Sequence, residues 1–134
     1  MPIGALPPVL LVEDDERYAR ACRRALTHHG LQVCWVRSAT EARTVLELDS
    51  LPYFEYALVD DRLPDGFGLD LMPLLHALTP RPASALMTAY ASYHRALAAY
   101  GAGYVLFPKP ETPRKLVDLL CALDRQRGAL RADR

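Results

Sequence analysis

Five short apolar runs alternate with segments of helical periodicity, and this alternation constrains the fold more than any other feature of the sequence. The runs lie at residues 8–12, 32–36, 56–59, 83–87 and 103–107. Each has the length of a strand, and parallel strands need crossover connections that are usually helical. The alternation therefore predicts an α/β fold in which helices cover both faces of a parallel sheet.

The segments between these runs carry residues that begin and end helices. Tyr18, Cys22 and Leu26 recur at helical spacing before Gly30, a residue that favours helix termination. Ser38, followed three residues later by Glu, is typical of a capping box. Gly101 is expected to end the fourth helix in the same way as Gly30. The predicted helices cover residues 16–29, 38–48, 69–78, 92–100 and 112–127.

Length and composition are those of an ordinary globular domain. The 134 residues are 51% hydrophobic and 24% charged, which predicts one domain and excludes a disordered or fibrous chain. The 16 basic and 16 acidic residues cancel, which argues against a nucleic-acid-binding surface. Neither a signal peptide nor an apolar run of about 18 residues is present, and the three scattered cysteines form no CxxC motif. We therefore expect a cytoplasmic protein.

The zero net charge conceals two acidic clusters, which follow the first and third apolar runs and contain half of the acidic residues. The carboxyl ends of parallel strands meet at one edge of a sheet, where ligands bind in open α/β folds. Four of the five predicted strands deliver a reactive polar group to that edge. These groups belong to Glu13, Asp14, Asp60, Thr88 and Lys109.

Three carboxylates beside one ammonium are costly to bury, because desolvation and mutual repulsion disfavour their charged forms. A hard divalent cation removes this cost, and an all-oxygen site with room for water suits Mg²⁺. Asp60 beside Mg²⁺ and Lys109 is a plausible acceptor for a phosphoryl group, since both cations neutralise the phosphoryl oxygens.

The same segments give the chain a resemblance to the receiver domain of bacterial two-component response regulators. The matching stretches are residues 9–15 (VLLVEDD), 59–66 (VDDRLPDG), 86–90 (LMTAY) and 109–110 (KP). The resemblance implies a flavodoxin-like, doubly wound, five-stranded parallel sheet of strand order 2-1-3-4-5 with five helices.

The implied domain is a receiver at residues 1–127, followed by a frayed tail or linker start at residues 128–134. The stretch 88–92 resembles receivers that carry a C-terminal helix-turn-helix, so a DNA-binding module outside this chain is one expectation. A stand-alone receiver is the other.

In receivers, the residues at these positions bind a metal ion and accept a phosphoryl group. The resemblance implies that Asp60 takes the phosphoryl group from a histidine kinase or a histidine phosphotransfer protein. Mg²⁺ would be held by Glu13, Asp14, Asp60 and the backbone carbonyl of Arg62. The protein would catalyse only its own phosphorylation and dephosphorylation and would not otherwise be an enzyme.

The remaining implied roles concern the response of the domain to phosphorylation. Thr88 would donate a hydrogen bond to the phosphoryl oxygens, Lys109 would pair with them, and the Lys109–Pro110 bond would be cis. The output surface would be the fourth helix, fifth strand and fifth helix, which could also form a homodimer. Receivers commonly place an aromatic residue three positions before the lysine, whereas this chain has Leu106. A phosphorylation-independent interaction module is therefore an alternative function.

Several residues compete with these assignments. The acid-x-x-x-Pro-x-Gly spacing selects Asp60 over Asp61, which we interpret as a solvated turn residue. Arg62 stands where a haloacid-dehalogenase-type phosphatase needs a second aspartate, so that class is excluded. On the first predicted helix, Arg17 and Arg20 are candidates for docking the kinase.

Overall fold

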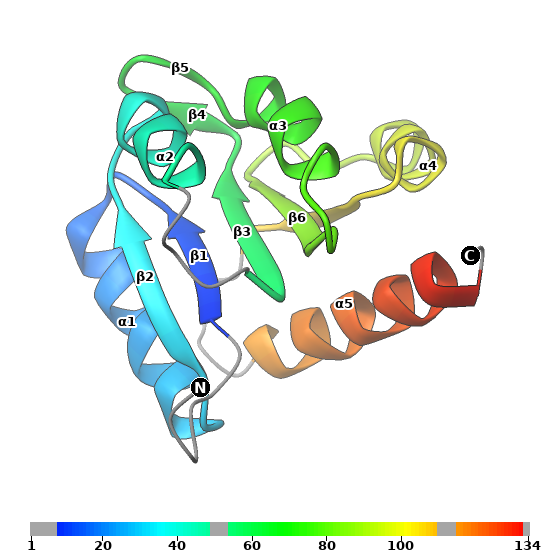
Figure 1. The fold of residues 1–134 in the computed structure, drawn as a ribbon, viewed down its shortest axis with the longest axis horizontal. Helices are drawn as coiled ribbons and strands as arrows, with labels where there is room; N and C mark the ends of the chain where they lie inside the picture. Colours follow the sequence, from blue (N-terminus) through cyan, green and yellow to red (C-terminus); the bar gives the residue numbers. More distant parts are fainter. Residues whose placement is uncertain (1–7, 49–53, 110–114, 133–134) are drawn as a thin grey trace.

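A five-stranded, all-parallel sheet lies at the centre of the structure (Figure 1). The computed structural model describes residues 8–48, 54–109 and 115–132. The strand order is β2-β1-β3-β6-β7, and β4 and β5 form a separate hairpin. The predicted order 2-1-3-4-5 is therefore confirmed, with β6 and β7 as its fourth and fifth strands. The five strands are β1 Pro8–Val12, β2 Gln32–Val36, β3 Tyr56–Asp60, β6 Ala83–Thr88 and β7 Val105–Pro108.

Helices cover both faces of this sheet, as predicted (Figure 1). The helices α1 and α5 pack on one face, and α2, α3 and α4 lie along the other. No helix among the described residues is long and apolar enough to cross a bilayer. The helices are α1 Glu16–His28, α2 Ala39–Leu46, α3 Met72–His76, α4 Tyr93–Ala102 and α5 Lys115–Ala132, with a 3-10 helix, η1, at Gly68–Leu71.

The central strands are buried on both faces, which explains why they appear in the sequence as continuous apolar runs. Side chains alternate between the faces along a strand. Leu11 and Leu58 pack with residues of α1 and α5, whereas Leu10 and Val59 pack with residues of α2 and α3. All four side chains are fully buried. The core therefore consists of two layers that hold the strand ends in fixed positions.

Three helix predictions need correction. The helix α4 continues through Gly101 and ends at Ala102, because Gly103, with a φ of 90°, adopts the left-handed conformation that closes it. The helix α5 continues to Ala132, five residues past the predicted end, since Gly128 costs only about 1 kcal/mol in a helix. The helix predicted at residues 69–78 is instead η1 followed by the short α3.

The turn between β4 (Arg62–Leu63) and β5 (Gly66–Phe67) caps a helix from outside. Asp65 accepts hydrogen bonds from the backbone N–H groups of Ala39 and Thr40, at 2.8 and 2.9 Å, and from the Thr40 hydroxyl, at 2.5 Å. These donors lie at the N-terminus of α2, where backbone N–H groups lack partners within the helix. The Thr40 hydroxyl, together with the two N–H groups, lowers the pKa of Asp65 to about 2.

Replacing Asp65 by Asn is expected to make the stability of the fold decrease less steeply as the pH falls into the acidic range. The lowered pKa means that the Asp65 carboxylate stabilises the fold fully above its ordinary pKa near 3.8, and that this contribution is lost as the pH falls toward about 2. Thermal unfolding midpoints between about pH 4 and pH 2 should therefore fall less steeply in Asp65→Asn than in the wild type. The exposed Asp70→Asn is the control, and identical slopes in all three proteins would contradict the expectation.

Candidate functional site

Three carboxylates meet at the carboxyl edge of the sheet. Glu13 and Asp14 directly follow β1, and Asp60 is the last residue of β3. One oxygen from each side chain lies within 4.8 Å of the other two. The Glu13 side chain is fully buried, Asp60 is nearly so, and Asp14 is exposed. The fold thus brings together the acidic residues that the sequence analysis assigned to this edge.

Lys109, which follows β7, lies against these carboxylates. Its Nζ is 2.8 Å from Oε1 of Glu13 and 3.6 Å from Oδ2 of Asp60. The ammonium also lies over the ring of Tyr18, 4.7 Å from its centroid. The backbone N–H of Lys109 donates to the carbonyl of Thr88 at 2.7 Å, which fixes the loop after β7 to the end of β6. One cation therefore faces two of the three carboxylates.

Burial and mutual proximity disfavour the state in which Glu13 and Asp60 are both ionised. Burial, with the neighbouring Asp60, raises the pKa of Glu13 to about 8, although Lys109 opposes the shift. Burial also raises the pKa of Asp60, against the lowering effects of its hydrogen bond with Glu13 and of the Lys109 charge. A divalent cation would supply the missing positive charge, and a donor set made only of oxygens suits Mg²⁺. The residues present therefore fit the predicted ion.

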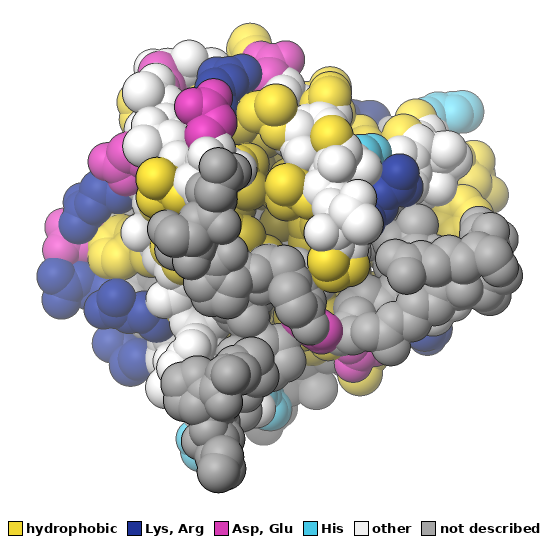
Figure 2. Space-filling view, viewed as in Figure 1, with side chains coloured by type: hydrophobic (Ala, Val, Ile, Leu, Met, Phe, Trp, Pro, Cys, Tyr) yellow, Lys and Arg dark blue, Asp and Glu magenta, His cyan; other side chains and the backbone are white. Residues whose placement is uncertain are grey.

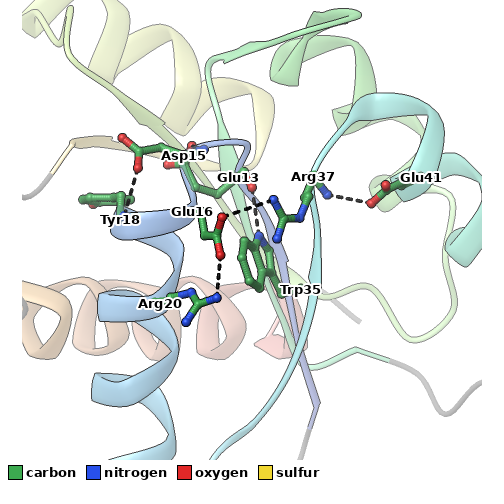
Figure 3. A network of polar contacts seen from close by, with 8 residues as sticks. All are labelled: Glu13, Asp15, Glu16, Tyr18, Arg20, Trp35, Arg37 and Glu41. Atoms are coloured by element: carbon green, nitrogen blue, oxygen red, sulfur yellow. Dashed lines mark hydrogen bonds and ion pairs between the residues drawn. The ribbon is translucent and has the colours of Figure 1, made fainter.

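Contacts from α1 and β2 hold the loop that carries Glu13 (Figure 3). The indole Nε1 of Trp35 donates to the carbonyl of Glu13 at 2.8 Å, and the Arg37 guanidinium lies over the indole, 4.5 Å from its centroid. Asp15 donates its N–H to Oε2 of Glu13 at 3.3 Å and accepts from the N–H of Tyr18 at 3.1 Å. This role of Trp35 could not be predicted from the sequence, where its only signal is its place near the end of the second apolar run.

The hydroxyl of Thr88 is held by Asp61. Thr88 Oγ1 donates to Oδ2 of Asp61 at 2.7 Å and accepts from the N–H of Tyr90 at 2.9 Å. The Arg95 guanidinium lies 3.4 Å from the same Asp61 oxygen. The interpretation of Asp61 as a solvated turn residue is therefore wrong. Its N–H donates to the carbonyl of Met87 at 2.8 Å, and this bond draws Asp61 against the end of β6.

The other predicted residues flank this site. Arg62 begins β4, two residues after Asp60, and its guanidinium lies over the ring of Tyr90, 4.9 Å from the centroid. Leu106 is half-buried in β7 and packs into the core layer beside α2 and α3. The predicted cis bond before Pro110 lies outside the described residues. The metal-binding role of the Arg62 carbonyl stays a prediction.

Comparison with known families identifies one domain over most of the chain. The model of the response regulator receiver domain matches residues 9–121. The photosynthetic apparatus regulatory protein RegA of Rhodovulum sulfidophilum is 33% identical over 101 residues, which are 75% of this chain and 54% of that protein. The response regulator protein PilR of Pseudomonas aeruginosa is 32% identical over 89% of this chain and 26% of its own length. The chain thus spans about half or less of these relatives.

Solved structures show the same fold. A CheY-like response regulator receiver domain protein from Methanospirillum hungatei superposes with a TM-score of 0.76 at 29% identity, covering 93% of this chain and 99% of that one. A response regulator from Burkholderia pseudomallei, solved with a phosphorylated aspartic acid, calcium ion and citrate, has a TM-score of 0.74 at 27% identity. That comparison covers 95% of this chain and 72% of the other. The flavodoxin-like fold predicted from the sequence is confirmed.

Proposed function

The chain belongs to the family of response regulator receiver domains, and from this premise we propose that Asp60 accepts a phosphoryl group from a histidine kinase or a histidine phosphotransfer protein in a Mg²⁺-dependent reaction. The observation that carries the proposal is the cluster of the Glu13, Asp14 and Asp60 carboxylates facing Lys109 at the carboxyl edge of the sheet. The domain would act in the cytoplasm as a switch that catalyses only its own phosphorylation and dephosphorylation.

In the proposed transfer, a carboxylate oxygen of Asp60 attacks the phosphorus of a phosphohistidine. The new O–P bond forms as the P–N bond breaks, and the departing imidazole nitrogen takes a proton from water. The Lys109 ammonium, 3.6 Å from Oδ2 of Asp60, is placed to pair with a phosphoryl oxygen. Mg²⁺ held by Glu13, Asp14, Asp60 and the Arg62 carbonyl would neutralise further phosphoryl charge. The similarity to a regulator solved with a phosphorylated aspartic acid supports this chemistry.

Phosphorylation by acetyl phosphate tests the proposal without a kinase. Incubation with acetyl phosphate and Mg²⁺ should add the mass of one phosphoryl group to the intact protein, and EDTA should prevent the addition. Asp60→Asn should remain unmodified, whereas Asp70→Asn, an exposed aspartate outside the cluster, should be modified as fully as the wild type. Equal modification of Asp60→Asn would overturn the proposal.

Docking of the kinase is proposed at α1, where exposed Arg side chains gather (Figure 2). Replacing Arg17 by Glu is expected to slow phosphotransfer from the cognate kinase about tenfold or more, because the change reverses a charge at the contact. Labelling by acetyl phosphate should stay unchanged, since Arg17 lies outside the acidic cluster. The matched control is Arg81→Glu, an exposed arginine after α3. Unchanged transfer in Arg17→Glu would exclude this docking surface.

The output surface is proposed to be α4, β7 and α5, either as a homodimer contact or as a contact with a DNA-binding module outside this chain. Large apolar side chains on α4 are exposed, including Tyr93 at 75%, Leu97 at 53% and Tyr100 at 80%. Exposed apolar side chains grouped on one helix favour an interaction surface over open solvent. Size-exclusion chromatography with and without acetyl phosphate tests the homodimer contact: a shift to the dimer mass on phosphorylation would support it, and an unchanged monomer mass would exclude it.

A phosphorylation-independent interaction module is the second candidate function. Two observations favour it: Leu106 occupies the position of the usual aromatic switch residue, and Asp61 already engages the Thr88 hydroxyl. This candidate predicts that Mg²⁺ binds while the oligomeric state and partner binding stay the same after phosphorylation. A change in either property on phosphorylation would exclude it.

A further inference from the structure

A hydrogen-bonded chain links the end of β6 to the first turn of α4 through a residue that the proposed phosphotransfer does not use. Asp61 Oδ2 accepts the Thr88 hydroxyl proton at 2.7 Å and lies 3.4 Å from Nη2 of Arg95. Nη1 of the same guanidinium donates to Thr88 Oγ1 at 3.3 Å and to the Tyr90 carbonyl at 2.8 Å. Arg95 therefore ties the β6–α4 loop to Asp61.

A hydroxyl has one proton to donate. While the Thr88 proton is donated to Asp61, it is withheld from any acceptor on Asp60. The backbone of Asp61 is held on both sides, because its N–H donates to the Met87 carbonyl at 2.8 Å and its carbonyl accepts from the Gly68 N–H at 2.9 Å. A change of partners in this chain would therefore involve the side chains of Asp61, Thr88 and Arg95.

We propose that Asp61 is a positioning residue, which holds the Thr88 hydroxyl away from Asp60 in the unphosphorylated protein and couples it through Arg95 to α4. When a phosphoryl oxygen on Asp60 takes the Thr88 hydrogen bond, the Arg95 contacts at Thr88 and Asp61 loosen and the first turn of α4 is released. The hydrogen-bonded side chains of Asp61, Thr88 and Arg95 would then transmit the signal. In receivers with an aromatic residue at the position of Leu106, that aromatic residue would transmit it. This inference rests on the proposed function of Asp60.

Side-chain chemistry supports the exchange of partners. The Thr88 side chain is buried, with 1% exposure, and the Asp61 side chain is 15% exposed, so water competes weakly for their hydrogen bond. Hydrogen bonds to a charged acceptor are the stronger ones, so another anion beside Thr88 would compete with Asp61 better than a neutral acceptor would. A phosphoryl group on Asp60, the residue adjacent to Asp61, would be such an anion.

Hydrogen exchange of the α4 backbone amides tests the coupling before any phosphorylation. Asp61→Ala and Arg95→Gln should each raise exchange in the first turn of α4 about threefold or more, because each removes contacts that hold the β6–α4 loop. His94→Ala is the control, since His94 is an exposed neighbour of Arg95 on the same helix. Exchange equal to the wild type in both variants would overturn the proposal.

The rate of labelling by acetyl phosphate tests the positioning of the hydroxyl. Asp61→Ala should be labelled about threefold faster or more than the wild type, because the Thr88 hydroxyl becomes available to the phosphoryl group. In a Thr88→Ala background the same substitution should leave the rate unchanged. An equal gain in both backgrounds would reflect the lost charge alone and would overturn the proposal. If no protein is labelled, the function proposed for Asp60 fails, whereas the exchange data still decide whether Asp61 restrains α4.

Discussion

Mg²⁺ added to the metal-free protein is expected to raise the free energy of unfolding by about 2.7 kcal/mol at about one hundred times its dissociation constant. This is the mass-action gain from an ion that binds only the folded state. An ion is expected to bind at this site because burial, together with the repulsion from Asp60, raises the pKa of Glu13 to about 8, and Lys109 is the cation that faces the two carboxylates. A divalent ion that binds only the folded state relieves this repulsion. Thermal unfolding across a Mg²⁺ titration at pH 7.5 measures the gain.

The same titration has an optical readout. Trp35 is the single tryptophan of the chain, and its Nε1 donates to the Glu13 carbonyl, so its fluorescence should change as the ion binds. Asp14→Asn should lose most of the stabilisation by Mg²⁺ and most of the fluorescence change, because the substitution removes one carboxylate of the proposed site. Asp14 is exposed, so it can be changed without disturbing the core. Asp70→Asn should behave like the wild type. Undiminished stabilisation of Asp14→Asn by Mg²⁺ would contradict the assigned site.

Replacing Gly68 by Ala is expected to destabilise the fold by about 3 kcal/mol, at the upper end of overpacking effects. A Cβ at this position would lie 2.1 Å from the carbonyl oxygen of Asp60 and 2.7 Å from Cγ1 of Val59. The backbone at the end of β3 would have to move, and with it the Asp60 carboxylate. The variant should therefore lose labelling by acetyl phosphate as well as stability. Urea unfolding would measure the loss of stability.

Gly101→Ala is the matched control for this substitution. Gly101 lies inside α4, and a Cβ added there meets no atom within 4 Å. The change should therefore stabilise the protein by about 0.5–1 kcal/mol, since alanine loses less backbone entropy in a helix. Equal stability of Gly68→Ala and Gly101→Ala would contradict the close packing of Gly68 against Asp60.

The sheet could be predicted from the sequence because each of its strands corresponds to a separate apolar run. The length of the apolar runs, the helical periodicity between them and the capping residues distinguished the strands from the helices, and the parallel order followed from the crossovers and the family resemblance. Helix ends were predicted less well. Gly101 and Gly103 both precede the last strand, and only the backbone conformation distinguishes the helical glycine from the one that closes the helix. The hairpin β4–β5 has only two residues a strand, which is too short to leave a pattern.

The carboxylate cluster could be predicted because the carboxyl ends of parallel strands lie at one edge of the sheet, independently of the conformation of the loops. The roles of Asp61 and Trp35 could not, because they depend on contacts between residues 27 and 22 positions apart. An aspartate beside a turn is usually solvated, whereas the Asp61 side chain is held at Thr88 by its contacts with the Thr88 hydroxyl and with Arg95, next to the backbone bond from Asp61 N–H to Met87. Gly68 gave no signal either, since its importance lies in what a Cβ would strike.

Locating the phosphoryl group on the chain tests the central claim most directly. An acyl phosphate is reduced by borohydride to an alcohol, so a phosphorylated aspartate becomes homoserine, which peptide mass spectrometry can place. After labelling with acetyl phosphate and Mg²⁺, we expect homoserine at position 60, with Asp14 and Asp61 unchanged. Homoserine at position 61 or 14, with Asp60 intact, would contradict the assignment of Asp60 as the phosphoacceptor.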